Sequence, residues 1–235
     1  MLNRREMDLN EALLARVERV VPDDGDAAEG LVEMTDAEIE VAARRYLAEM
    51  AGAPFRVFAY GSLIWKPEFE FVEASQAVIY GWRRSFCITM HSFRATRDQP
   101  GLMLALERGE SVRGMAFRLP EEAPLAQMKR LLKREGAFQE SMPCFRWLPA
   151  RVAGEIVKVL VFYAMPKGHA WVDDLPVEEK VRRLARAAGR MGSCAAYLRN
   201  TVQHLEEKGI HDRYLWDLQR RVAAEIAGME PLVQQ

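Results

Sequence analysis

The sequence has few cysteines, and their arrangement excludes two kinds of architecture. Cys87, Cys144 and Cys194 are odd in number and form no Cys-x-x-Cys pair, so they predict neither a disulfide framework nor a zinc cluster. Such sparse use of cysteine is typical of a reducing compartment, and we expect a cytoplasmic location. The four histidines are scattered, with no second His or Cys at ligand spacing. We therefore expect no metal site.

Long apolar runs and net charge are also lacking. No stretch is apolar over the thickness of a bilayer, so we expect no membrane partner. Acidic and polar residues follow the Arg4-Arg5 pair where a signal peptide would be apolar, so we expect no signal peptide. A formal net charge of −1 gives no reason to expect nucleic acid as a partner. The 235 residues are 49% hydrophobic, which suffices for one sizeable core.

The first 54 residues predict helices and carry no recognisable chemistry. One helix is expected over about residues 8–20, and Pro22–Gly30 is expected to be a connector. Thr35 and Glu38 form a capping box that starts a second helix, which ends near Gly52. We expect this helical N-terminal extension to pack on the main body or on a partner.

From Phe55 onward the pattern changes to short strands separated by Gly or Pro. Many short strands at this spacing favour either a sandwich or a closed barrel. Leu104, Leu106 and the run Val157–Phe162 are predicted to lie in the core. The predicted strands are residues 56–60, 77–83, 85–90, 102–107, 112–119, 145–151 and 156–164.

A helix predicted from Glu121 to about Glu135 carries the most informative residue pattern. Leu125, Met128 and Leu132 recur at helical spacing, and Glu135 is the next position on the same stripe. A carboxylate there is either buried, and then paired or protonated with a raised pKa, or it turns to solvent or pairs with a neighbouring cation. Gly136 is expected to end the helix in the left-handed conformation.

A second candidate site is the stretch Tyr60-Gly61-Ser62-Leu63, which interrupts the first strand. Its small residues would leave adjacent backbone N–H groups without bulky cover, and such a pair can hold an anion or a carbonyl that gains negative charge. An ordinary turn at the end of a strand explains the pattern equally simply. The C-terminal third is predicted to be helical, with Ser193 capping a helix whose inner face includes Tyr197.

The chain resembles the ChaC-type γ-glutamylcyclotransferases from about Phe55 to Ile226. The resemblance implies an α+β fold, a small mixed β-barrel of γ-glutamylcyclotransferase-like type with packed helices. We expect residues 1–54 to be the extension, 55–228 the family domain and 229–235 a C-terminal tail. The motifs that carry the resemblance are Val57–Pro67, Gly81–Cys87, Arg113–Leu119, Arg134-Glu135, Gly192-Ser193, Tyr197-Leu198, Asn200-Thr201 and His204-Leu205.

The resemblance implies a lyase that acts on glutathione without a cofactor. The α-amine of the γ-glutamyl residue attacks its own side-chain amide, which gives 5-oxoproline and Cys-Gly. Glu135 matches the family's catalytic glutamate, and Glu140 is a second candidate carboxylate because relatives differ after Arg134-Glu135. The substrate-binding residues implied by the resemblance are Ala59, Tyr60, Gly61, Ser62, Leu63, Ile64 and Tyr197.

Several other residues admit two interpretations. Arg83 and Arg113 can bind a substrate carboxylate, but a salt bridge on a strand face is the simpler expectation. Cys87 is expected to be an inert buried thiol. Ser62 lacks the Gly-x-Ser-x-Gly pattern of a hydrolase nucleophile.

Two further functions remain compatible with the sequence. One is cyclotransfer on another γ-glutamyl amine or peptide, and the other is non-catalytic binding of γ-glutamyl compounds. We expect a monomer or a weak dimer with glutathione as its small-molecule partner.

Overall fold

The structure is a computed structural model that describes residues 6–19, 21–22, 31–136, 138–165 and 175–230. Contacts between residues divide the chain into two compact units. The barrel unit comprises Glu29–Ser85 and Leu104–Trp171, and the helical unit comprises Met1–Ala28, Phe86–Met103 and Val172–Gln235. The sequence-predicted extension is therefore divided between the two units.

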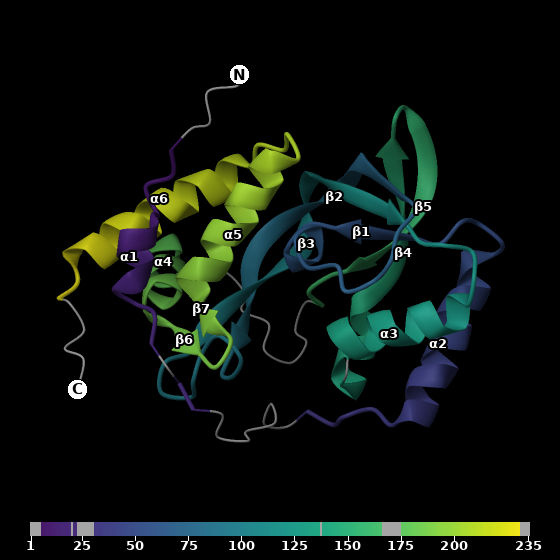
Figure 1. Ribbon diagram of the computed structural model, residues 1–235, viewed down its shortest axis with the longest axis horizontal. Coiled ribbons are helices and arrows are strands. Elements are labelled where there is room, and N and C mark those ends of the chain that lie inside the picture. Colours follow the sequence, from purple (N-terminus) through teal and green to yellow (C-terminus); the bar gives the residue numbers. More distant parts are fainter. Residues whose placement is uncertain (1–5, 20, 23–30, 137, 166–174, 231–235) are drawn as a thin grey trace. The chain divides into compact units, whose positions relative to one another are not determined.

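The strands form a closed barrel in the order β1-β3-β2-β4-β5 (Figure 1). β1 runs antiparallel to β3, with Val57 opposite Phe117, and β1 closes the barrel through a parallel contact with β5, where Val57 meets Leu160. The barrel confirms one of the two all-strand arrangements that the sequence left open. The strands are β1 (Arg56–Ala59), β2 (Glu73–Met90), β3 (Gly101–Arg118), β4 (Phe145–Val152) and β5 (Glu155–Phe162).

Seven short strands were predicted, but two pairs of them are single strands of 18 residues, β2 and β3. The sequence suggests a break near Gly109, whereas this glycine lies within β3 beneath a side chain from β2. A Cβ at Gly109 would lie 2.6 Å from Cγ of Arg83. Gly109 therefore serves close packing and does not mark a turn.

The barrel core consists of alternating inward side chains from all five strands. Leu106, Val159 and Val161 are fully buried, as the sequence predicted for this part of the chain. The core cluster contains Phe58, Ala77, Ile79, Trp82, Leu106, Val112, Ala116, Ala150, Val152, Val159 and Val161. A packed interior of this kind leaves function to the loops and helices at the barrel ends.

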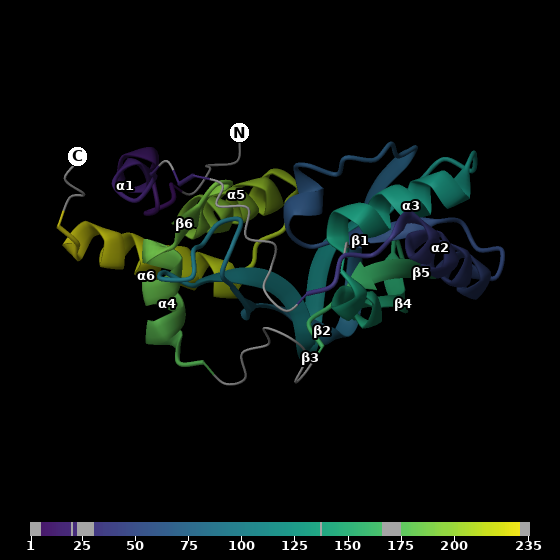
Figure 2. The same ribbon diagram turned by 90° about the horizontal axis from the view of Figure 1, so that it is seen from below.

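In the described part of the barrel unit, two helices and two 3-10 turns accompany the barrel: α2 (Asp36–Met50), α3 (Pro124–Glu135), η1 (Ser62–Ile64) and η2 (Gln139–Cys144). The capping box of Thr35 and Glu38 at the start of α2 is present. α2 lies beside α3 in both views (Figures 1 and 2).

The predicted left-handed stop after α3 is wrong, because Gly136 has φ −153°. A Cβ at Gly136 would lie 2.4 Å from Cε2 of Phe145. Close approach of an aromatic ring is therefore what favours glycine at this position.

The helical unit contains α1 (Glu11–Ala15), α4 (Val177–Arg186), β6 (Ala188–Gly189), β7 (Gly192–Ser193), α5 (Cys194–Glu207) and α6 (Arg213–Gly228). Ser193 caps α5 through its hydroxyl, as predicted. α1 starts later than the predicted helix, because Asn10 rather than Asp8 accepts the capping hydrogen bond, and it ends earlier, at Ala15. Most of the predicted connector, residues 23–30, lies outside the described residues. Over the described part of the chain, no helix has the length and apolarity needed to cross a membrane.

Candidate active site

The loop after β1 forms a compact 3-10 turn. The N–H of Ile64 donates to the carbonyl of Gly61 at 2.9 Å, and the N–H of Lys66 donates to the carbonyl of Ser62, also at 2.9 Å. Within the described residues, no hydrogen bond from the N–H groups of Gly61, Ser62 or Leu63 is found. The turn thus leaves consecutive donors available, as the sequence predicted for this stretch.

Most side chains of this loop point into the protein. Ala59 is fully buried, and Leu63 and Ile64 are 4% and 6% exposed. Tyr60 and Ser62 are half-buried. The buried residues of the predicted binding loop can therefore contact a ligand only through their backbone, whereas Tyr60 and Ser62 can also use their side chains.

Contacts with β2 and β3 hold the loop and the end of β1 in place. A Cβ at Gly114 of β3 would lie 2.4 Å from the carbonyl oxygen of Ala59 and 2.6 Å from Cζ of Phe58. The absence of a side chain at Gly114 lets the end of β1 lie directly against β3. Arg84, which is 5% exposed, donates from Nε to the carbonyl of Tyr60 at 2.7 Å and from Nη2 to the carbonyl of Arg113.

Glu135 is the last residue of α3, and its side chain is 22% exposed. Burial raises its pKa, while the Arg134 guanidinium opposes that rise and the nearby Glu68 carboxylate adds to it. Nε of Arg134 donates to Oε1 of Glu135 at 2.8 Å. Glu135 is therefore both partly buried and paired, which joins the two interpretations that the sequence left open.

Arg134 also connects Glu135 to the chain that follows the loop. Its Nη1 lies 2.5 Å from Oε2 of Glu68, and the other oxygen of Glu68 lies 3.1 Å from Nζ of Lys66. Arg134 is 14% exposed, so this connection is partly shielded from water. The structure thus brings the C-terminal end of α3 and the continuation of the loop to one guanidinium.

A surface hollow of about 330 Å³ lies next to this connection. It is lined by Pro67, Glu68, Phe69, Arg130, Leu131, Lys133 and Arg134. None of the predicted substrate-binding residues is part of this lining. The ion pairs around Arg134, by contrast, involve Glu135 itself.

Tyr197 belongs to the helical unit, so its place in the site remains a prediction. Within that unit its ring is 8% exposed and packs edge-on against Phe86, with ring centroids 6.1 Å apart. The Arg94 guanidinium lies over the same ring, 5.4 Å from its centroid.

The other candidates have structural partners. Arg83 pairs with Glu107 at 2.7 Å, which is the salt bridge expected on a strand face. The carboxylate of Glu140 accepts a hydrogen bond from the N–H of Val32 at 3.1 Å. Cys87 is buried and forms no disulfide, in agreement with an inert thiol. In the described part of the chain, no group of three or more His, Cys, Asp or Glu is arranged to hold a metal.

Arg84 is the residue of this region that the sequence interpretation missed, since it singled out the neighbouring Arg83. Arg84 lies two residues from Trp82 and from Phe86, both buried, whereas Arg83 points outward with its side chain 64% exposed. Burial does not alternate through this part of β2, because Ser85 and Cys87 are buried as well, so strand periodicity does not single out Arg84.

Comparison with known proteins gives consistent results. A model of ChaC-like proteins matches residues 55–225. The glutathione-specific γ-glutamylcyclotransferase of Escherichia coli (strain K12) is 36% identical over 165 residues, 70% of this chain and 71% of that protein. γ-Glutamylcyclotransferase 2-3 of Arabidopsis thaliana is 29% identical over 183 residues, 75% of this chain and 92% of that protein.

A solved structure supports the fold. The crystal structure of the glutathione-specific γ-glutamyl cyclotransferase from yeast aligns with a TM-score of 0.65 at 19% identity and covers 74% of this chain and 97% of that chain. From the family match and the identity to the bacterial relative, the chain belongs to the ChaC-like protein family.

Proposed function

We propose that the protein is a glutathione-specific γ-glutamylcyclotransferase. The α-amine of the γ-glutamyl residue attacks the side-chain carbonyl carbon, a new C–N bond closes a five-membered ring, and the amide bond to cysteine breaks. The products are 5-oxoproline and Cys-Gly, and no oxidant or reductant is consumed. The names of the relatives support this substrate, and the environment of Glu135 is the observation that carries the chemistry.

Glu135 acts as the proton carrier in this reaction. Its carboxylate takes a proton from the ammonium group, which makes the amine nucleophilic, and returns a proton to the departing amide nitrogen. A free carboxylate is a weak base for an ammonium group, so a pKa raised by burial improves the match. Arg134 limits that rise and keeps the ionised form accessible.

The loop after β1 binds the γ-glutamyl group. The N–H groups of Ser62 and Leu63 donate to one of its anionic oxygens, either the α-carboxylate or the carbonyl oxygen that becomes negative during attack. Tyr60 and Ser62 contribute side chains. Tyr197, which belongs to the helical unit, is a further substrate contact proposed from the family resemblance alone. Holding the flexible chain so that amine and carbonyl approach contributes several kcal/mol to catalysis, roughly 7 or more in well-oriented systems.

The test is to incubate the purified protein with glutathione and to quantify 5-oxoproline and Cys-Gly. Equal amounts of both products support the proposal. Activity on other γ-glutamyl compounds without activity on glutathione would replace the substrate. Saturable binding of glutathione without any product would indicate a binding protein and would contradict catalysis by Glu135.

The cellular setting is part of the same proposal. We place the enzyme in the cytoplasm as a monomer or weak dimer, with residues 55–228 as its catalytic domain. Cys87, Cys144 and Cys194 form no disulfide, which supports a reducing compartment. Light scattering of the purified protein determines its mass.

A further inference from the structure

The segment that follows Glu135, residues 138–144, is held by residues from outside the family match, which starts at residue 55. We propose that residues 31–50, and Tyr46 above all, form a positioning element that fixes Glu135 for catalysis. This inference rests on the proposed function, because it assigns the element to the same carboxylate. All the contacts that support it lie within the barrel unit.

The first set of contacts joins residues 32–38 to the start of η2. Glu33 and Phe138 form an isolated antiparallel bridge. The N–H of Gln139 donates to the carbonyl of Val32 at 2.9 Å, and the side-chain amide of Gln139 donates to the carboxylate of Glu38 at 2.8 Å. The N–H of Val32 also donates to the Glu140 carboxylate. These contacts pair two segments that are far apart in sequence, since Val32 and Glu140 are 108 residues apart.

The second set centres on Tyr46, which is 1% exposed. Its hydroxyl donates to the carbonyl of Met142 at 2.6 Å, near the end of η2. Its ring packs against Phe145 with centroids 5.7 Å apart, and its own carbonyl accepts from the indole N–H of Trp147 at 3.0 Å. Phe145 in turn occupies the space that a side chain at Gly136 would need, directly after Glu135.

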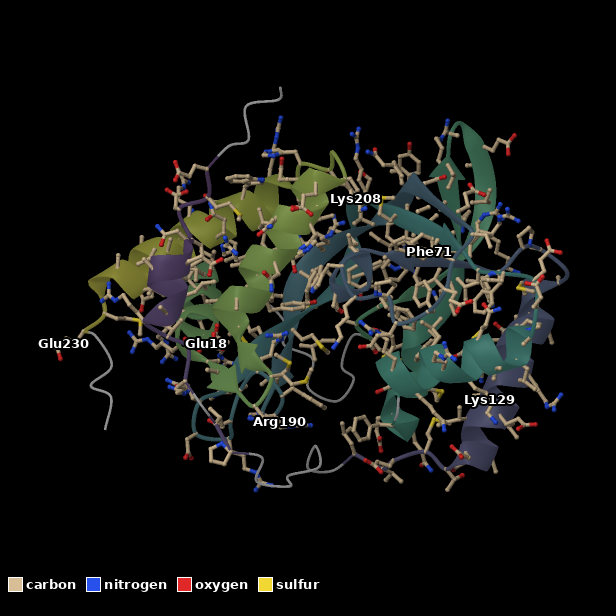
Figure 3. All side chains as sticks on the ribbon, viewed as in Figure 1. Glu18, Phe71, Lys129, Arg190, Lys208 and Glu230 are labelled. Carbon is tan, nitrogen blue, oxygen red and sulfur yellow. The ribbon has the colours of Figure 1, made fainter. Side chains whose placement is uncertain are left out.

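The third set joins α2 to the outer surface of α3. Nζ of Lys133 lies 2.5 Å from Oδ1 of Asp36, and Nζ of Lys129 lies 3.0 Å from Oε2 of Glu40. Figure 3 labels Lys129, whose side chain lies where α3 adjoins α2. Exposed ion pairs of this kind stabilise little, so their role is to set how α2 lies along α3.

Together the contacts constrain the chain on both sides of Glu135. On the N-terminal side of Glu135, the last turns of α3 contact α2. On its C-terminal side, η2 and Phe145 contact residues 32–46. A catalytic carboxylate must be held close to its working geometry, since a misplacement of about 1 Å can cost on the order of a hundredfold in rate. The element thus supplies from outside the family domain the rigidity that the end of a helix lacks.

The test uses Tyr46→Phe in the full-length chain, with Tyr80→Phe as matched control. Both changes remove one hydroxyl, but Tyr46 is buried and Tyr80 is 61% exposed. For Tyr46→Phe we expect kcat for 5-oxoproline formation to fall about tenfold with KM within about threefold of wild type. Hydrogen exchange of residues 138–145 should become about fivefold faster, the factor for one lost hydrogen bond.

The pH profile separates positioning from general stability. A looser segment admits water to Glu135 and so lowers its raised pKa, which moves the acidic limb of kcat to lower pH. The inference is overturned if Tyr46→Phe keeps the kcat, the pH limb and the exchange pattern of wild type. A wild-type protein that forms no 5-oxoproline overturns the proposed function instead, and the exchange data then still report whether Tyr46 holds the segment.

Discussion

Two segments of the barrel unit carry the proposed site, and they are fixed in opposite ways. The loop after β1 is closed by its own backbone, with hydrogen bonds that span three or four residues between Gly61 and Lys66. Residues 138–144 are fixed from afar, for example by Tyr46, which is 96 residues from Met142 in sequence. Because its hydrogen bonds are local, the loop can be predicted from the sequence. The surroundings of Glu135 depend on tertiary packing and cannot be predicted in this way.

We predict that proton transfer depends on Glu135, which lies next to the segment that distant residues hold in place. Glu135→Gln keeps the shape of the side chain and an acceptor for Arg134 but removes the proton carrier. We expect kcat to fall by roughly 10²–10⁴, the range for loss of a general acid or base. The rate of 5-oxoproline formation from glutathione measures the loss.

Two comparisons sharpen that prediction. Glu140→Gln retains an acceptor for Val32 and should keep its rate within about threefold of wild type.

Because burial raises the pKa of Glu135, its contribution to stability is complete at low pH and is lost as pH rises through the folded-state pKa. Glu135→Gln should therefore melt no lower than wild type at neutral pH, and a clear drop in Tm would mean that its rate loss reflects unfolding.

For the loop after β1, the corresponding change is Gly114→Ala. The new methyl group would meet the carbonyl of Ala59 and the ring of Phe58, so β1 and its loop must shift. We expect about 1–3 kcal/mol of destabilisation, and about a tenfold loss of kcat/KM as the loop donors move. Urea unfolding and steady-state kinetics measure the two effects.

Gly228→Ala is the control for that change, because no atom lies within 4 Å of the added methyl group and the backbone is helical. It should be neutral or slightly stabilising. If Gly114→Ala behaves in the same way, the close fit of β3 behind the loop is not required.

The smallest effect is expected at the ion pair of Glu68 and Arg134, which joins the chain after the loop to the end of α3. Glu68→Gln removes a carboxylate whose charge raises the pKa of Glu135, and it leaves Arg134 to Glu135 alone. Both consequences lower that pKa, so the acidic limb of the activity profile should move to lower pH. Because Glu68 is 47% exposed, the rate at neutral pH should change less than about fivefold. An acidic limb that moves upward would contradict this linkage.

Much of the fold follows from patterns within short windows. The barrel strands, the stripe on α3, the capping box at Thr35 and the cap at Ser193 depend on residues close in sequence, and all of them are present. The predicted break within β3 fails for a reason outside such windows. Arg83 from β2 covers Gly109 of β3, and this contact exists only once the strands have paired.

In the candidate site, too, the residues that depend on local patterns could be predicted and those that depend on tertiary contacts could not. Glu135 and the bare donors near Ser62 are recognisable from helical spacing and small residues. The roles of Arg84, Glu68 and Tyr46 depend on which distant carbonyls and charges they reach, and no local pattern gives these partners.

The most direct test of the central claim is the pH dependence of kcat/KM for 5-oxoproline formation from glutathione by wild-type protein. If the partly buried Glu135 is the essential base, the acidic limb lies above the usual range of a glutamate, and Glu135→Gln abolishes it together with most of the rate. An acidic limb in the ordinary glutamate range, or the same limb in Glu135→Gln, would contradict the account.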